Sequence, residues 1–93
     1  MPRYLVIRTF DVGEEEMPEV GRRSRKTIED GYPQIVWEHS HVIVRDDGTV
    51  MTYCVYDAPS EDVVREHAVD LGRHTVDDVL EIAGDVTPAD FPA

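Results

Sequence analysis

The sequence feature that most constrains the fold is the dipeptide Asp47-Gly48, which lies between two runs rich in β-branched and aromatic residues. Asp-Gly in this setting is a strong local signal for a β-hairpin closed by a two-residue turn. We therefore expect antiparallel strands over residues 35–45 and 49–57, with Asp47 and Gly48 as the turn residues.

Further strand and helix patterns flank this hairpin. Residues 3–10 are rich in β-branched and aromatic residues and predict a first strand, and residues 78–86 fit a last strand. A helix is expected over residues 14–30, which open with three glutamates where the helix dipole favours anions. A second helix is expected over residues 61–71, after Ser60 as the N-cap.

The element order β-α-β-β-α-β predicts an α+β fold, the ferredoxin-like sandwich. In it, one four-stranded antiparallel sheet carries both helices on a single face. We expect residues 1–86 to form this one domain and residues 87–93 to form a C-terminal tail. Since the other sheet face has no cover of its own and a chain of 93 residues is small, the pattern favours a homodimer.

The charge balance excludes several classes of partner. The chain has 9 Lys and Arg against 20 Asp and Glu, a formal net charge of −11. Nucleic acids are bound by Lys and Arg that neutralise phosphates, and anionic membrane surfaces attract basic segments. We therefore expect neither nucleic acid nor a membrane as partner, whereas divalent cations stay open.

The length of the apolar runs and the number of cysteines bear on the compartment and on which cysteine sites can form. The longest apolar run covers residues 4–7, too short for a spanning helix or for the apolar region of a signal peptide, so a cytoplasmic location is expected. Cys54 is the single cysteine, which rules out an intrachain disulfide and a Cys-pair zinc site.

The predicted hairpin brings together side chains that can bind a metal or take part in catalysis. With a two-residue turn, His41 lies opposite Cys54 and His39 lies opposite Tyr56. Because His39 and His41 are two apart on a strand, they share a face, so two imidazoles, a thiol and a phenol gather on one sheet surface. A three-residue loop would instead slip the pairing by one and put Cys54 opposite Ser40.

Imidazole and thiolate are ligands for nickel, copper, zinc or iron, which makes this cluster a candidate transition-metal site. We assign His39, His41, Cys54 and His67 as the metal-ligand candidates, without requiring all four on one ion. The alternative is that His39 and His41 line a half-buried face or a dimer seam, and that Cys54 is a small core residue.

His67 lies in the middle of the apolar stripe of the second predicted helix, so it should point at the sheet. A buried histidine needs a hydrogen-bond partner, and Tyr53 or a backbone carbonyl could supply it. In an enzyme, His67 or His41 would act as general base, and Tyr53 or Tyr56 would orient a small-molecule substrate. His74, after the helix-ending Gly72, is expected to cap the helix or to face solvent.

Three stretches carry a family resemblance: residues 37–42 (WEHSHV), residues 52–60 (TYCVYDAPS) and residues 65–68 (REHA). They resemble a small bacterial family of domains of unknown function that includes a nickel-binding, nickel-responsive protein. The resemblance implies a ferredoxin-like subunit, a homodimer, Ni²⁺ held on the dimer surface and a role in nickel sequestration. The family motif often has Tyr where this chain has His41, which adds a candidate ligand here.

Three functions from different classes follow from these observations. The leading hypothesis is a small cytosolic, homodimeric protein that binds a transition metal, nickel first, for sequestration or homeostasis rather than turnover. The second is a small-molecule enzyme of the dimeric α/β-barrel type, such as a monooxygenase or isomerase. The third is an oligomerisation or regulatory module in which the histidines are structural. The fold does not choose among them.

Overall fold

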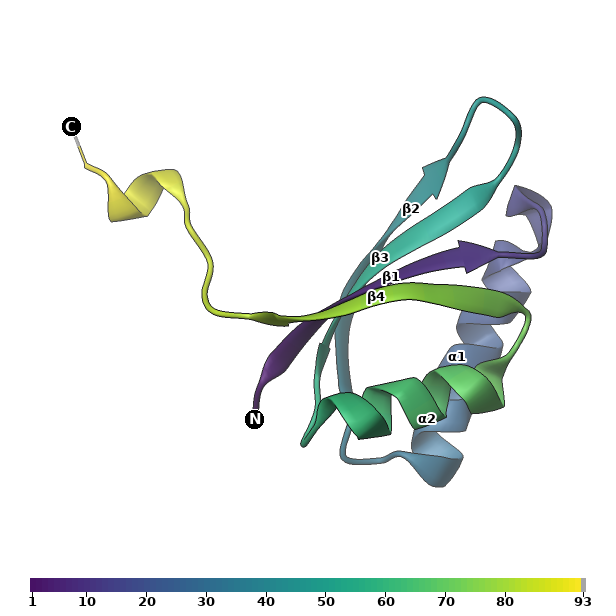
Figure 1. The fold of residues 1–93 in the computed structure, drawn as a ribbon, viewed down its shortest axis with the longest axis horizontal. Coiled ribbons are helices and arrows are strands. Elements are labelled where there is room, and N and C mark those ends of the chain that lie inside the picture. Colours follow the sequence, from purple (N-terminus) through teal and green to yellow (C-terminus); the bar gives the residue numbers. More distant parts are fainter. Residues whose placement is uncertain (93) are drawn as a thin grey trace.

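The computed structural model describes residues 1–92, which form one four-stranded antiparallel sheet with two helices on one of its faces (Figure 1). The strands run in the spatial order β2-β3-β1-β4. The elements in chain order are β1 (Arg3–Phe10), a 3₁₀ turn (Glu14–Glu16), α1 (Met17–Gly31), β2 (Val36–Val44), β3 (Val50–Asp57), α2 (Glu61–Leu71), β4 (His74–Ile82) and a second 3₁₀ turn (Pro88–Asp90). The predicted ferredoxin-like fold is confirmed.

β1 and α2 lie at the residues where the local sequence signals predicted them. Ser60 is the N-cap of α2 and its hydroxyl accepts a hydrogen bond from the backbone N–H of Val63. Gly72 ends the helix with φ of 71°, a left-handed conformation that glycine adopts without steric cost.

The predicted last strand, residues 78–86, is wrong in its bounds, because β4 runs from His74 to Ile82. The chain turns sharply through Gly72 and Arg73, both with positive φ, so it re-enters the sheet at once and His74 pairs with Phe10. Pairing with β1 therefore outweighs the two aspartates at positions 77 and 78, which interrupt the strand pattern in the sequence.

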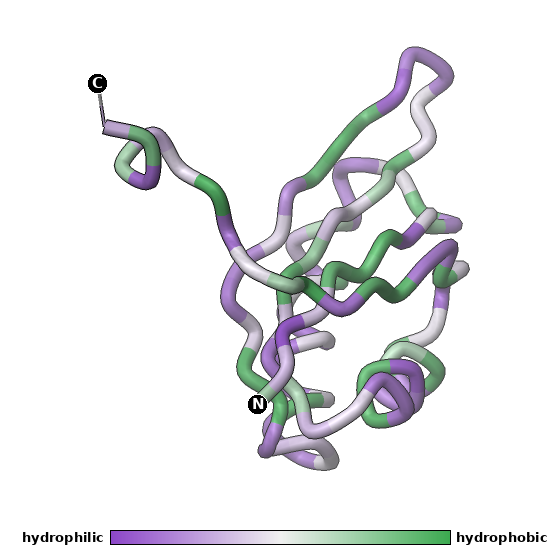
Figure 2. The backbone as a smooth tube through the Cα atoms, turned by 60° about the vertical axis from the view of Figure 1, so that its left-hand side comes forward, coloured by the Kyte–Doolittle hydropathy of each residue, from purple (hydrophilic) through white to green (hydrophobic). Residues whose placement is uncertain are grey.

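The two faces of the sheet differ in what covers them. Alternate residues of β1 and β3 point towards the helices and are buried there, while those between them point to the other side. No helix of residues 1–92 packs on that other side, which we call the open face (Figure 1). Figure 2 shows hydrophobic and hydrophilic residues interspersed along the strands and a hydrophilic hairpin tip between β2 and β3. None of the helices in the described part of the chain combines the length and apolar character needed to span a bilayer.

The hairpin between β2 and β3 has a three-residue loop, so the two-residue turn expected from Asp47-Gly48 is wrong. Val44 pairs with Val50, and the backbone N–H of Arg45 donates to the carbonyl of Thr49 at 2.9 Å. Gly48, with φ of 87°, takes the left-handed position that this loop type needs at its third residue. An Asp-Gly pair is compatible with a two-residue turn and with a three-residue loop. The three-residue loop shifts the pairing of β2 with β3 by one residue.

A β-bulge at Glu38 makes a second change in the pairing of β2. Trp37 pairs with Tyr56, but His39 pairs with Val55, so Glu38 is the extra residue. The bulge puts Trp37 on the helix side of the sheet, not with His39 on the open face as the alternation predicts. The indole Nε1 of Trp37 donates to Ser40 Oγ at 2.9 Å on the helix side.

Candidate functional site

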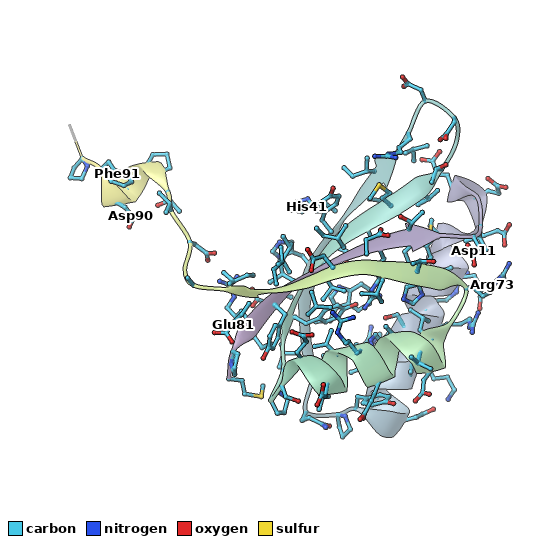
Figure 3. The ribbon with its side chains drawn as sticks, viewed as in Figure 1. Asp11, His41, Arg73, Glu81, Asp90 and Phe91 are labelled. Atoms are coloured by element: carbon cyan, nitrogen blue, oxygen red, sulfur yellow. The ribbon has the colours of Figure 1, made fainter. Side chains whose placement is uncertain are left out.

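The two histidines of β2 lie side by side on the open face. His39 and His41 are both exposed, and their ring centroids are 5.2 Å apart in an edge-to-face arrangement. Their cross-strand partners are Val55 and Tyr53, whose side chains share the open face. Figure 3 shows His41 on the side of the sheet away from the helices.

The carboxylate next to this pair is already engaged. Glu38 accepts two hydrogen bonds from the guanidinium of Arg3, at 2.7 Å and 3.1 Å. The hydrogen bond from Arg3 lowers the pKa of Glu38 to about 2. Arg3 also pairs with Asp85 at 2.9 Å, which ties the segment after β4 to the first strand. Glu38 therefore serves as a structural ion-pair partner at the bulge.

Cys54 lies on the opposite side of the sheet from the histidine pair. Its cross-strand partner is Ser40, as the alternative three-residue loop requires. The side chain is buried, and its Sγ donates to Thr52 Oγ1 at 3.3 Å. The thiol thus faces the helices, and the register that would place it beside His41 is excluded.

His67 is fully buried in α2 and also faces the helix side of the sheet. Its Nε2 lies 3.4 Å from Ser24 Oγ of α1, and its ring contacts the rings of Tyr32 and Tyr56 edge-on. Burial, together with the nearby charge of Arg8, lowers the pKa of His67 from 6.5 to about 4. The side-chain partner is thus Ser24 rather than the predicted Tyr53, and the ring is neutral near pH 7.

The four predicted metal ligands therefore fall into two sets. His39 and His41 are on the open face, whereas Cys54 and His67 lie between the sheet and the helices. Within residues 1–92, no group of three or more His, Cys, Asp or Glu side chains is placed to hold one ion. A single chain thus offers at most the two imidazoles of β2 to a metal at the open face.

The residues of the enzyme alternative are divided in the same way. Tyr53 shares the open face with His41, whereas Tyr56 is buried on the helix side beside His67, 5.8 Å between ring centroids. Burial raises the pKa of Tyr56 to about 12, so its phenol stays protonated and can donate a hydrogen bond.

His74 caps the end of α2, which is one of its two expected roles, and it does not face solvent. It is the first residue of β4, is half-buried, and its ring packs on Phe10 at 5.0 Å between centroids. Its Nδ1 lies 2.7 Å from the carbonyl oxygen of Gly72, so the ring does bond to the end of α2. Burial and the charge of Arg8 lower its pKa.

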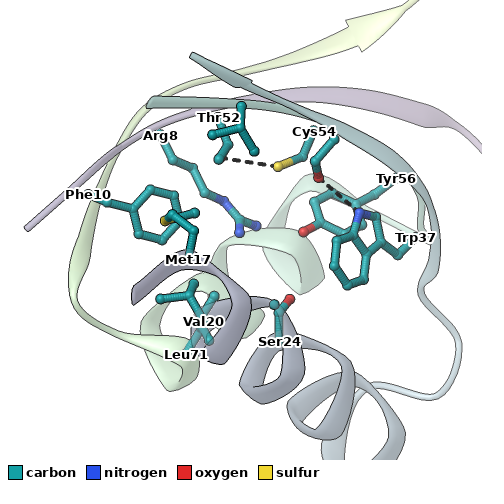
Figure 4. Close-up of a pocket in the computed structure, with 13 residues that line it drawn as sticks. Arg8, Phe10, Met17, Val20, Ser24, Trp37, Thr52, Cys54, Tyr56 and Leu71 are labelled. Carbon is teal, nitrogen blue, oxygen red and sulfur yellow. Dashed lines mark hydrogen bonds between the residues drawn. The ribbon is translucent and has the colours of Figure 1, made fainter. Parts of the chain in front are cut away.

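Sequence reasoning missed Arg8. The alternation in β1 sends Tyr4, Val6 and Phe10 to the helix side, and Arg8 falls on the same side, where it is only 2% exposed. The signal was a charged residue in phase with the apolar residues of the strand. Figure 4 shows its guanidinium reaching between the sheet and α1.

Comparison with known proteins identifies the family. The family model described as "Nickel responsive protein SCO4226-like" matches residues 4–82. The chain belongs to this SCO4226-like family. The match spans every strand and both helices, and it confirms the resemblance read from the sequence. No curated protein matches the chain.

A solved structure with a TM-score above 0.5 supports the fold. The C-terminal domain of the MgtC protein from Mycobacterium tuberculosis, a solution structure, superposes with a TM-score of 0.60 at 13% identity, covering 90% of this chain and 88% of that one. A structural-genomics protein, YJCS, matches with a TM-score of 0.47 at 12% identity, covering 91% of this chain and 100% of that one. At these identities the MgtC domain indicates a shared fold alone.

Proposed function

We propose that this SCO4226-like protein binds Ni²⁺ through His39 and His41 and acts as a cytoplasmic homodimer in nickel sequestration or homeostasis, without turnover. The observation that carries the proposal is the pair of exposed imidazoles with ring centroids 5.2 Å apart. The nickel-responsive description of the family supports the choice of metal.

The donor set fits such an ion. Neutral imidazole nitrogen is a good ligand for nickel, and it binds first-row metals at about 2.0–2.1 Å, so neighbouring rings on one strand face can turn towards a shared ion. His39 and His41 are exposed and could turn without disturbing the core. When bound, the ion would be held by coordination alone, with water or a second copy of the chain supplying further ligands.

The open face supports the homodimer. It carries the apolar side chains of Leu5, Ile7 and Leu80, and Leu80, which pairs with Leu5 of β1, is 46% exposed. Contiguous exposed apolar surface on a small domain marks an interaction site. A second copy packed on this face would bury it and bring two histidine pairs to one assembly.

Cys54 and His67 take structural roles in this proposal. The thiol hydrogen-bonds Thr52, and the imidazole fills the space between α1, α2 and Tyr56. Both lie on the far side of the sheet from the histidine pair. This separates the proposal from one in which all four side chains bind one ion.

The test is Ni²⁺ titration of untagged protein by isothermal calorimetry, comparing the wild type with the double variant His39→Ala/His41→Ala. We expect the double variant to lose the nickel site while the matched control Cys54→Ser retains it. A stoichiometry of one ion per chain would indicate water as the remaining ligands, and one ion per two chains would indicate ligands from both copies. Unchanged binding in the double variant would refute the proposal.

A further inference from the structure

A cavity lies between the sheet and α1, away from the histidine pair, with a volume of about 260 Å³ (Figure 4). This is just below the ~300–1,000 Å³ of typical small-molecule pockets, so it suits a small ligand. Its walls are mostly apolar and include Phe10, Met17, Val20 and Leu71. The cavity therefore resembles a ligand pocket in size and character.

A buried positive charge lies in this apolar cavity. Arg8 is 2% exposed, and its Nε and Nη2 have no hydrogen-bond partner among the described residues. The ion pairs of residues 1–92 involve other arginines or Lys26, and none includes Arg8. Its one favourable charge contact is with the ring of Tyr56, 5.3 Å from the guanidinium carbon to the ring centroid.

Arg8 cannot lose its positive charge by deprotonation. Guanidinium stays protonated in proteins, and a buried charge is strongly destabilising unless it is paired and hydrogen-bonded. The charge of Arg8 also adds to the effect of burial in lowering the pKa of His67 and of His74. No Asp or Glu is among the described residues that line the cavity, so Arg8 has no carboxylate partner in its wall.

Hydroxyl groups line the cavity close to this charge. Thr52 and Tyr56 of β3 and Ser24 of α1 all contribute to the wall. The Thr52 oxygen accepts a hydrogen bond from Cys54, which leaves its own proton to be donated. A planar anion bound by Arg8 would therefore find further donors within the same wall.

The edge strand gives the cavity an entrance. Val42 points to the helix side of β2, lines the cavity and is 52% exposed, so the cavity opens to solvent at this edge of the sheet. A small molecule can enter there with its charged end first and leave its apolar part against the side chains of α1.

We propose that this cavity binds a small organic carboxylate, with the carboxylate on the two unpaired guanidinium nitrogens of Arg8 and the apolar body against Phe10, Met17 and Leu71. A carboxylate matches the planar donor fork of Arg8, and the apolar walls favour an organic body over an inorganic anion. This site is separate from the proposed nickel site, because it lies on the opposite face of the sheet and uses none of its residues.

The test uses hexanoate, with hexanamide as the neutral isostere and inorganic phosphate as the compact anion, titrated into the full chain by calorimetry and by NMR. We expect hexanoate to bind, hexanamide and phosphate to bind at least about ten-fold more weakly, and the NMR-measured pKa of His67 to rise when hexanoate neutralises Arg8. Equal binding of hexanoate and hexanamide, or stronger binding of phosphate, would overturn the proposal.

Two variants locate the site. Arg8→Met removes the charge and should weaken hexanoate about ten-fold or more, while the exposed control Arg25→Met leaves binding unchanged. Gly21→Leu should block the cavity without altering Arg8, since a Cβ at Gly21 meets no atom within 4 Å and the residue lines the wall.

Gly31→Leu is the matched control for Gly21→Leu, because Gly31 is in the same helix with equally open space but does not line the cavity. Gly21→Leu also keeps the proposal testable if Arg8→Met does not fold. Full hexanoate affinity in folded Gly21→Leu would overturn the assignment, whatever the outcome of the nickel titration.

Discussion

Ser40 lies directly opposite Cys54 in the hairpin, so the Cys54 thiol faces the helices while His39 and His41 face away from them. This pairing divides the polar residues of the hairpin between two surfaces. The histidine pair belongs to the open face, and the thiol belongs to the wall of the Arg8 cavity. Each surface therefore has to be tested with its own residues.

The first prediction concerns His41, the residue that the family motif often replaces with tyrosine. We expect His41→Tyr to weaken Ni²⁺ binding by at least the ~10–100-fold that loss of a supporting group costs at a metal site. Because His41 is exposed, the free energy of unfolding should change by no more than about 0.5 kcal/mol. Calorimetric titration and urea unfolding measure the two quantities, and nickel affinity equal to that of the wild type would exclude His41 as a ligand.

The second prediction concerns the proposed homodimer. Leu80→Glu places a charge in the open face and should weaken the dimer by about 2 kcal/mol or more. Val69→Glu is the control, because Val69 is 79% exposed on α2, away from the open face. Analytical ultracentrifugation over a concentration series measures both. If Leu80→Glu and Val69→Glu dissociate alike, the open face is not the interface.

The third prediction is a pH dependence that comes from His67. Since its pKa is about 4 in the folded chain and 6.5 when unfolded, only the unfolded chain takes up the proton between these values. Stability from this group is complete above pH 6.5 and falls as the pH drops towards 4, by about 3 kcal/mol. His74, whose pKa is also lowered, acts in the same direction.

Urea unfolding between pH 4.5 and 7 measures this slope. His67→Gln should flatten it, whereas the exposed control Val69→Ala, which removes no titratable group, should leave it as in the wild type. The ion pair between Glu38 and Arg3 is lost only at lower pH, because the pKa of Glu38 is about 2 in the folded chain. A His67 ring that titrates near 6.5 by NMR would contradict the prediction.

The fourth prediction concerns the loop that sets the hairpin register. Gly48→Ala forces a Cβ into φ of 87° and should lower the free energy of unfolding by about 1 kcal/mol. Gly31→Ala, at a helical position with open space, should leave stability unchanged or raise it by a few tenths of a kcal/mol. Equal effects from the two variants in urea unfolding would argue against the three-residue loop.

Much of the architecture could be predicted because its signals are local. Ser60 and Gly72 bound α2 as their cap chemistry requires, and the alternation along β1 separates the side chains buried under the helices from those of the open face. The burial of His67 follows from its place in the apolar stripe of α2. These features depend on residues that are close together in the sequence.

The site could not be predicted in the same way, because it depends on register. Asp47-Gly48 suits both a two-residue turn and a three-residue loop, and one residue of slip moves Cys54 from the side of His41 to the opposite face. The bulge residue Glu38 accepts a hydrogen bond from Arg3, which is 35 residues away in the chain. Arg8 was missed because charge normally predicts exposure, and its burial shows only in three dimensions.

X-ray absorption spectroscopy of the nickel-loaded, untagged protein tests the central claim most directly, since it reports which atoms bind the metal. We expect a first shell of nitrogen and oxygen with the outer-shell scattering of imidazole, and the same spectrum from Cys54→Ser. Nickel–sulfur scattering in the wild type that disappears in Cys54→Ser would contradict the separation of the thiol from the histidine pair.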